Sequence, residues 1–355
     1  MAILSHKKFI SGQNITIEMA KDLILTIDYE VFLGDETGNL REVLIEPTYQ
    51  LMEILRLNGS KMTVFWDIMH YDALCRLSKE YPRLKEEQLL IEQQIKDLVA
   101  EGHDVQMHIH PHWLDAKYNG EKWLFDYSRF SLHKYNHNKD EKDVNTIIGC
   151  ILQMKHLMEE VICPVKPDYH VTTYRAGGYL IEPFEELAEA FNAAGITKDS
   201  SVCPGLVKRT TIYPYDFRGY PNSLSYRFGN TPRHPESNGE FIECPVYTIR
   251  LGLLYRIKRI ISRGKRVQCK EKLKGKGVNF PMEKRNRIQS FLEHLFNNKI
   301  QLTLDGADTI QFNYSLKEAP NNAVMILHPK MQTNHSLNLL KESIINGKVK
   351  FHSIR

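Results

Sequence analysis

Three histidines within five positions give the strongest chemical signal in this 355-residue sequence. The segment 106–113 reads Gln-Met-His-Ile-His-Pro-His-Trp, which places histidines at positions 108, 110 and 112. Side chains two residues apart share one face of an extended chain, so these imidazoles can converge. Converging imidazoles suit Zn²⁺ and similar first-row metals. The segment therefore predicts a metal site at a strand end, and Pro111 predicts that His112 approaches the metal from a turn.

Two carboxylates follow the first strong apolar run and can complete such a site. Asp28-Tyr-Glu30 comes directly after Leu23-Ile-Leu-Thr-Ile27. One carboxylate can bind the metal, while the other takes a proton from water whose pKa the metal lowers. The residues alone do not show which carboxylate is the ligand and which is the base, so Asp28 and Glu30 are each candidates for both roles.

Apolar strands and amphipathic helices alternate along the chain and bring polar side chains to strand ends. Strands are predicted at 22–28, 61–67, 104–110, 172–178 and 323–328, and helices at 46–58, 84–100, 144–161 and 182–194. This alternation is typical of an α/β fold with a mainly parallel sheet. Catalytic groups gather at the carboxyl ends of parallel strands, so the pattern favours an enzyme.

Five short motifs follow one another along the chain. They are Thr26-Ile-Asp-Tyr-Glu30, Glu101-Gly-His-Asp-Val-Gln-Met-His-Ile-His-Pro-His112, Tyr174-Arg-Ala-Gly-Gly178, the weaker Gly195-Ile-Thr-Lys-Asp-Ser-Ser201, and Ile326-Leu-His-Pro329. In this order they resemble the motifs of the polysaccharide deacetylase family, the metal-dependent carbohydrate esterases related to the nodulation deacetylases. Together they extend over nearly the whole chain. The resemblance implies an irregular (β/α) barrel, with residues 1–355 forming one large domain that carries loop elaborations and a basic insertion or lid at about 251–290.

The resemblance also implies catalytic roles for three residues. Asp28 matches the base that activates water, and Arg175 matches the arginine that orients this base. His328 matches the histidine that protonates the leaving amine, a role that suits a side chain titrating near neutral pH. Asp199, in the weak fourth motif, is expected to support the structure near the arginine motif.

The metal ligands implied by the resemblance are Glu30, His108 and His112. Tyr29 stands where the family usually has its ligand aspartate, so Glu30 is the natural replacement. His110 is then a substrate contact or the main rival for a ligand position. The implied metal is Zn²⁺, with Co²⁺ or Ni²⁺ as alternatives. Asp67 and His70, at another strand end, either support the site or only cap the strand.

Positive charge is concentrated in one stretch of the chain. Residues 256–287 hold 13 Lys or Arg and two acids, a charge of +11, whereas the whole chain carries +4. Residues 251–262 have apolar side chains at helical spacing. The stretch is either a solvated surface or a docking site for an anionic partner, such as a membrane surface or a nucleotide- or lipid-linked sugar. Nucleic acid is disfavoured, because aromatic residues do not interleave with the charges.

The remaining sequence features bear on where in the cell the protein acts. No apolar run has 18 residues, the six cysteines form no CxxC pair, and the first residues lack an apolar core behind a basic lead. We therefore expect a cytoplasmic protein. The resemblance implies that it removes an N-acyl group, most simply acetyl, from a sugar in surface-polysaccharide or O-antigen biosynthesis. The alternatives are a non-catalytic carbohydrate-binding relative, a metal-dependent amidase acting on a non-sugar amide, and a glycosidase with a carboxylate pair.

Overall fold

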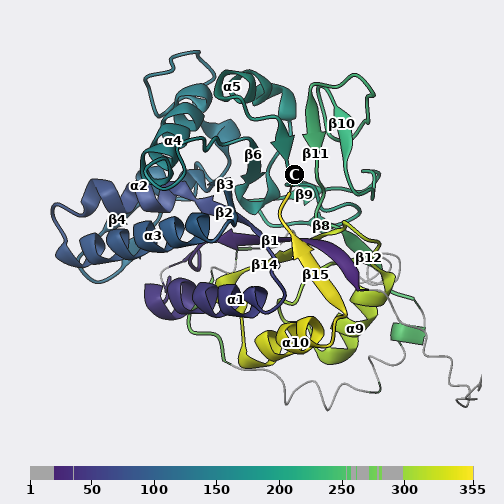
Figure 1. The fold of residues 1–355 in the computed structure, drawn as a ribbon. Helices are drawn as coiled ribbons and strands as arrows, with labels where there is room; N and C mark the ends of the chain where they lie inside the picture. Colours follow the sequence, from purple (N-terminus) through teal and green to yellow (C-terminus); the bar gives the residue numbers. More distant parts are fainter. Residues whose placement is uncertain are drawn as a thin grey trace, which may run out of the picture.

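A mainly parallel β-sheet forms the centre of the computed structural model, and helices cover its outer side (Figure 1). The structure describes residues 20–34, 36–252, 254–256, 261, 272–277, 280–281 and 299–354. The central strands are β1 (Lys21–Tyr29), β2 (Thr63–Asp67), β3 (Asp104–Ile109), β6 (Thr173–Ala176), β7 (Lys198–Asp199), β10 (Tyr226–Phe228), β11 (Phe241–Glu243), β14 (Val324–Leu327) and β15 (Val349–His352).

The strand order is β10-β11-β7-β6-β3-β2-β1-β14, with β15 also paired to β1. All these pairs are parallel except β10 with β11. Beyond β11, Tyr247 N–H donates to Val324 O (2.9 Å), and Leu302 N–H donates to Tyr247 O (2.8 Å). Isolated parallel bridges also join Val246 and Thr303 to β14. Irregular backbone thus links the β11 side to β14, which confirms the predicted α/β fold of the irregular (β/α) barrel type.

Seven helices among the described residues surround this sheet. They are α1 (Glu46–Arg56), α2 (Ile68–Leu77), α3 (Pro82–Ala100), α4 (Ile147–Ile162), α5 (Ala188–Ala194), α9 (Thr309–Glu318) and α10 (Asn334–Ile345). These helices bury apolar side chains, and in α1 these include Leu51, Met52 and Leu55, all fully buried. Helices α1, α9 and α10 lie below β1 and β15 in Figure 1, whereas α2, α3 and α4 lie to the left.

Shorter elements complete the described part of the chain. The pairs β4 (Lys117–Tyr118) with β5 (Trp123–Leu124), β8 (Val207–Lys208) with β9 (Tyr215–Asp216), and β12 (Thr248–Arg250) with β13 (Lys299–Gln301) are two-stranded and antiparallel. Short turns of 3-10 or π helix are η1 (Arg41–Ile45), η2 (Pro111–Asp115), η3 (Leu132–Lys134), η4 (Gly177–Tyr179), η5 (Phe184–Glu186) and η6 (Pro329–Met331).

Most of the basic segment lies outside the described residues, and so do six of the twelve residues in the stretch 251–262, whose apolar side chains have helical spacing. The described portions include Leu254 and Ile261, whose exposed fractions of 84% and 80% are the largest among the described large apolar residues. Residues 272–277 are joined to the body by the bridge from Lys276 to Glu36. Within the described part of the chain, none of the helices combines the length and apolarity that a membrane span needs.

Side chains alternate between the two faces of β1, and this alternation decides which of them face the site. Tyr29 points outward, and its hydroxyl donates to Gln94 Oε1 on α3 at 2.8 Å. The Gln94 amide nitrogen in turn donates to Ile45 O at 2.8 Å. Asp28 and Glu30, one position before and after, therefore share the opposite side. Tyr29 is a structural residue here, and Glu30 takes the inward position.

Replacing Tyr29 with phenylalanine tests this arrangement. The change leaves the buried Gln94 oxygen without its donor, so the free energy of unfolding should fall by about 1–3 kcal/mol. Chemical denaturation of Tyr29→Phe and wild type measures the difference, while elemental analysis should give the same metal content for both. An unchanged free energy of unfolding would show that the Tyr29–Gln94 bond does not contribute.

Candidate metal centre and active site

The carboxyl ends of four parallel strands bring the predicted functional residues together. Asp28 lies near the end of β1, and Glu30 follows it; His108 is near the end of β3, and His110 follows it. Two further strands supply Arg175 in β6 and His328 directly after β14. All six side chains are at least four-fifths buried, although their sequence positions span 300 residues.

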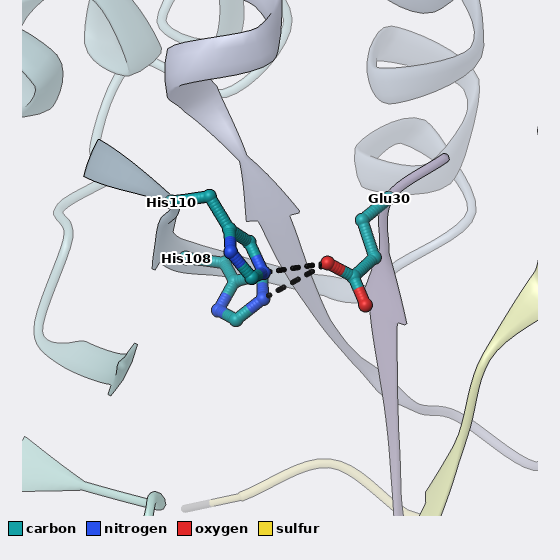
Figure 2. A group of neighbouring side chains, drawn as sticks. All are labelled: Glu30, His108 and His110. Atoms are coloured by element: carbon teal, nitrogen blue, oxygen red, sulfur yellow. Dashed lines mark ion pairs between the residues drawn. The ribbon is translucent and has the colours of Figure 1, made fainter. Parts of the chain in front are cut away.

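Glu30, His108 and His110 form a compact group in which both imidazoles point at one carboxylate oxygen (Figure 2). Glu30 Oε2 lies 2.6 Å from His110 Nε2 and 3.6 Å from His108 Nε2. Gly177 permits this close packing, because a Cβ there would lie 2.5 Å from Ile109 O and 2.7 Å from His110 Nδ1. One oxygen and two imidazole nitrogens form a donor set that suits Zn²⁺.

The bonding around this group fits a divalent metal. His108 Nδ1 lies 2.8 Å from Arg175 O, so it carries the proton and leaves the Nε2 lone pair directed at Glu30. His108 Nε2 is a buried atom without a hydrogen-bond partner among the described residues, and it faces Glu30 Oε2 at 3.6 Å. Two facing electron-pair donors need a cation or a proton between them. Burial opposes protonation of His108, but Asp28 and Glu30 outweigh it and raise the pKa of its ring.

His112 does not join the group, contrary to the ligand set that the resemblance implies. The 3-10 turn η2 begins at Pro111 and turns His112 away from the line of β3. Its ring stacks on Phe130 at 5.1 Å, and neither ring nitrogen has a hydrogen-bond partner among the described residues. Burial lowers the pKa of His112 well below its usual value, so this histidine is neutral. The structure thus brings His110, rather than His112, to Glu30.

Paired alanine variants separate the two candidate ligands. His110→Ala should reduce bound metal from about one equivalent to near zero, because it removes a donor that contacts Glu30. His112→Ala should retain at least half of the metal, since His112 contacts aromatic rings instead. Elemental analysis of both folded variants gives the comparison. Loss of metal in His112→Ala with retention in His110→Ala would reverse the assignment.

A fully buried guanidinium holds Asp28 in place. Arg175 donates from Nη1 to Asp28 Oδ1 (2.5 Å), from Nη2 to Ser200 Oγ (2.8 Å) and from Nε to Ser200 O (2.8 Å). Thr26 Oγ1 accepts from both terminal nitrogens at 3.1 Å. Burial alone would raise the pKa of Asp28, but Arg175, His108 and His328 outweigh it and lower that pKa. Asp28 is therefore ionised, with Oδ2 directed away from Arg175.

His328 lies on the other side of the carboxylates. Its Nε2 is 3.4 Å from Asp28 Oδ2 and 3.7 Å from Glu30 Oε1. Its Nδ1 lies 2.6 Å from Asp305 Oδ2, which fixes the ring orientation. Burial opposes protonation, but Asp28 and Asp305 raise the pKa of His328 to about 10. The imidazolium is thus available as a proton donor.

Sequence reasoning missed two residues of this centre, Asp305 and Lys330. Asp305 ends the alternating run Leu302-Thr-Leu-Asp305, a signal that could have marked it as a strand-end acid. Lys330 donates to Glu30 Oε1 at 2.8 Å and to Val31 O at 3.0 Å. It follows His328 by two residues, and nothing in the local sequence pattern indicates its partner.

Asp67 and His70 have different surroundings. Asp67, at the end of β2, is buried beside His108 and His110, and both of its carboxylate oxygens lack hydrogen-bond partners among the described residues. Burial raises the pKa of Asp67. His70 stacks on Trp113 at 4.5 Å, and burial lowers its pKa to about 3, so it is a neutral packing residue. Asp67 thus lies against the site, whereas His70 packs on the aromatic side chain of Trp113.

A buried acid pair supports the segment that binds Arg175. Asp199 accepts from Ser201 N–H (2.9 Å) and Ser201 Oγ (2.7 Å), and Ser201 Oγ accepts from Ala176 N–H (2.8 Å). The fully buried Glu243 interacts with Asp199, and burial followed by this neighbouring charge raises the pKa of Glu243 well above its usual value. The pair therefore keeps a shared proton to a higher pH than an exposed carboxylate does.

This proton makes stability depend on pH in a defined direction. Above pH 5 the unfolded chain has lost the Glu243 proton while the folded chain keeps it, so raising the pH favours unfolding by up to about 1.4 kcal/mol per unit until the raised pKa is passed. Glu243→Gln should flatten this decline between pH 5 and 8, relative to wild type and to the exposed control Glu240→Gln. Denaturant titrations at several pH values measure it. Parallel curves for all three proteins would contradict the shared proton.

A cavity of about 470 Å³ opens above the centre. Its floor includes Asp28, Glu30, His108, His110 and His328. Phe130, Tyr213 and Phe280 line one wall, with ring centroids 5.3–6.0 Å apart. The cavity thus combines a polar floor with an aromatic wall, an arrangement that suits an organic ligand with a polar reacting group.

Comparisons with known proteins gave matches only among solved structures. No family model and no curated protein matches the chain. A putative polysaccharide deacetylase from Mycobacterium smegmatis is 13% identical, with 98% of this chain and 92% of that chain covered and a TM-score of 0.38. A family 4 carbohydrate esterase from Streptomyces lividans, in complex with acetate, is 9% identical, with 93% and 91% covered and a TM-score of 0.36.

A family 4 pseudoenzyme from Bacillus anthracis is 10% identical, with a TM-score of 0.37; the match covers 95% of this chain but less than two thirds, 65%, of that protein. Carbohydrate esterases of the family that the sequence motifs resemble are thus among the matches. All three TM-scores lie below 0.5.

Proposed function

We propose that this protein is a metal-dependent hydrolase that removes an N-acyl group from a sugar. The observation that carries the proposal is the juxtaposition of three parts within one cavity floor. These are the Glu30–His108–His110 group, the ionised Asp28 held by Arg175, and the protonated His328. Such a set offers a metal site, a base and an acid for one acyl-transfer reaction.

Glu30, His108 and His110 would hold the divalent metal, for which Zn²⁺ is our first choice and Co²⁺ or Ni²⁺ the alternatives. When bound, the metal supplies Lewis acidity to the acyl carbonyl and lowers the pKa of water. Asp28 accepts the proton of the attacking water at Oδ2, because Arg175 occupies Oδ1. A C–O bond forms at the carbonyl carbon and the C–N bond breaks. His328 gives its Nε2 proton to the departing amine, leaving an amino sugar and a carboxylic acid.

The surroundings support a sugar on an anionic carrier as substrate. The aromatic wall offers apolar ring faces to a sugar. Lys276 lines the cavity mouth, while Lys272 and Lys274 line the smaller hollow beside it, and all three are exposed. A nucleotide or lipid phosphate would complement these lysines. We place the reaction in surface-polysaccharide or O-antigen assembly in the cytoplasm, with Leu254 and Ile261 as apolar contacts to a membrane.

Acetate release from UDP-N-acetylglucosamine and from free N-acetylglucosamine tests the proposal. The metal-loaded protein should release acetate, faster from the phosphate-bearing sugar. Asp28→Asn should lower kcat/KM by about 10²–10⁴-fold while keeping metal, because it removes the base but none of the proposed ligands. Asp22→Asn, at the opposite end of the same strand, is the matched control.

Three results would redirect the proposal. Equal turnover by Asp28→Asn and wild type would remove Asp28 as the base. Saturable sugar binding by a metal-loaded wild type that releases no acetate would favour a non-catalytic carbohydrate-binding relative. Hydrolysis of simple amides but of neither sugar would favour an amidase acting on a non-sugar amide.

A further inference from the structure

We propose that Lys330 is a positioning residue that fixes Glu30 for metal binding and at the same time limits the affinity of the centre for the metal. The proposal rests on the metal-dependent function given above. Lys330 lies in the short turn η6 directly after His328, and its side chain is only 11% exposed. Its ammonium contacts Glu30 Oε1 (2.8 Å) and Val31 O (3.0 Å), beside the Phe32 ring.

The two oxygens of Glu30 have separate partners. Oε2 faces His110 and His108, at 2.6 and 3.6 Å. Oε1 faces Lys330 at 2.8 Å and His328 at 3.7 Å. A hydrogen bond to the second oxygen of a ligand carboxylate fixes its orientation and tunes the metal. Lys330 therefore presents Glu30 to the metal through Oε2 alone.

The same contact places a fixed positive charge on the far side of the ligand carboxylate. The ion-paired carboxylates of the centre are Asp28, Glu30 and Asp305, and its fixed cations are Arg175 and Lys330. Together with the His328 imidazolium these charges sum to 0, so a divalent cation brings them to +2. Without Lys330 the sum is −1, and the bound cation would bring it only to +1. Because the charges are buried, this repulsion is weakly screened by solvent.

Lys330 thus has two effects on the centre that substitutions can separate. Its hydrogen bond should keep Glu30 in one orientation, and its charge should weaken metal binding. Glutamine in its place retains an amide donor but loses the charge, whereas methionine loses both. Arginine keeps the charge. Lys350, an exposed lysine on β15, provides a control for the loss of one positive charge elsewhere.

Cobalt titration of the chelator-treated full-length protein tests both claims without any substrate. Calorimetry gives the Kd for Co²⁺, and the visible absorption of the bound ion reports its coordination. Lys330→Gln and Lys330→Met should lower Kd at least tenfold, while Lys330→Arg and Lys350→Gln should stay within threefold of wild type. Lys330→Gln should keep the wild-type spectrum, and Lys330→Met should change it.

The outcomes distinguish Lys330 from the metal centre itself. If wild type binds cobalt and the Gln and Met variants match its Kd within twofold, or bind more weakly, the charge role of Lys330 is overturned while the proposed function stands. Identical spectra in all variants would overturn the positioning role. If no variant binds cobalt, although circular dichroism shows each to be folded, the metal-dependent function fails and the role of Lys330 fails with it.

Discussion

The rest of the centre depends on one interaction, the ion pair between the buried guanidinium of Arg175 and Asp28. Removing a charge from water is unfavourable unless its hydrogen bonds and its counter-ion are supplied inside the protein. Here Asp28 supplies the counter-charge, while Thr26 and Ser200 accept the other donors. The backbone carbonyl of Arg175 also accepts a hydrogen bond from the ring of His108. One residue of β6 thereby fixes both the proposed base and a proposed metal ligand.

Much of the architecture follows from local sequence patterns. The apolar runs before Asp28, Asp67, His108 and His328 correspond to β1, β2, β3 and β14, because parallel strands buried on both faces need continuous apolar residues. Strand alternation also explains why Glu30 takes the inward position and Tyr29 packs against Gln94. Helix α2 was missed because it follows β2 without a loop, so no turn residue marks its start.

The remaining parts of the centre depend on geometry that a local pattern does not encode. The three histidines have the spacing of one strand face, yet the 3-10 turn η2 ends the extended chain at Pro111 and redirects His112. Asp305 and Lys330 act through partners distant in sequence, and Glu30 lies 300 residues from Lys330. The motif resemblance implies a ligand set with His112, whereas the structure brings His110 to Glu30.

The pairing of β1 has a consequence for synthesis of the chain. The first described strand lies between β2 on one side and β14 and β15 on the other, so its second edge is formed by residues 324–327 and 349–352. During translation this edge stays open until residues 324–327 and 349–352 have been synthesised. Contacts this distant in sequence form slowly. Asp28 and Glu30 therefore meet His328 only after β14 has been synthesised and has paired with β1, so shorter nascent chains lack the complete centre.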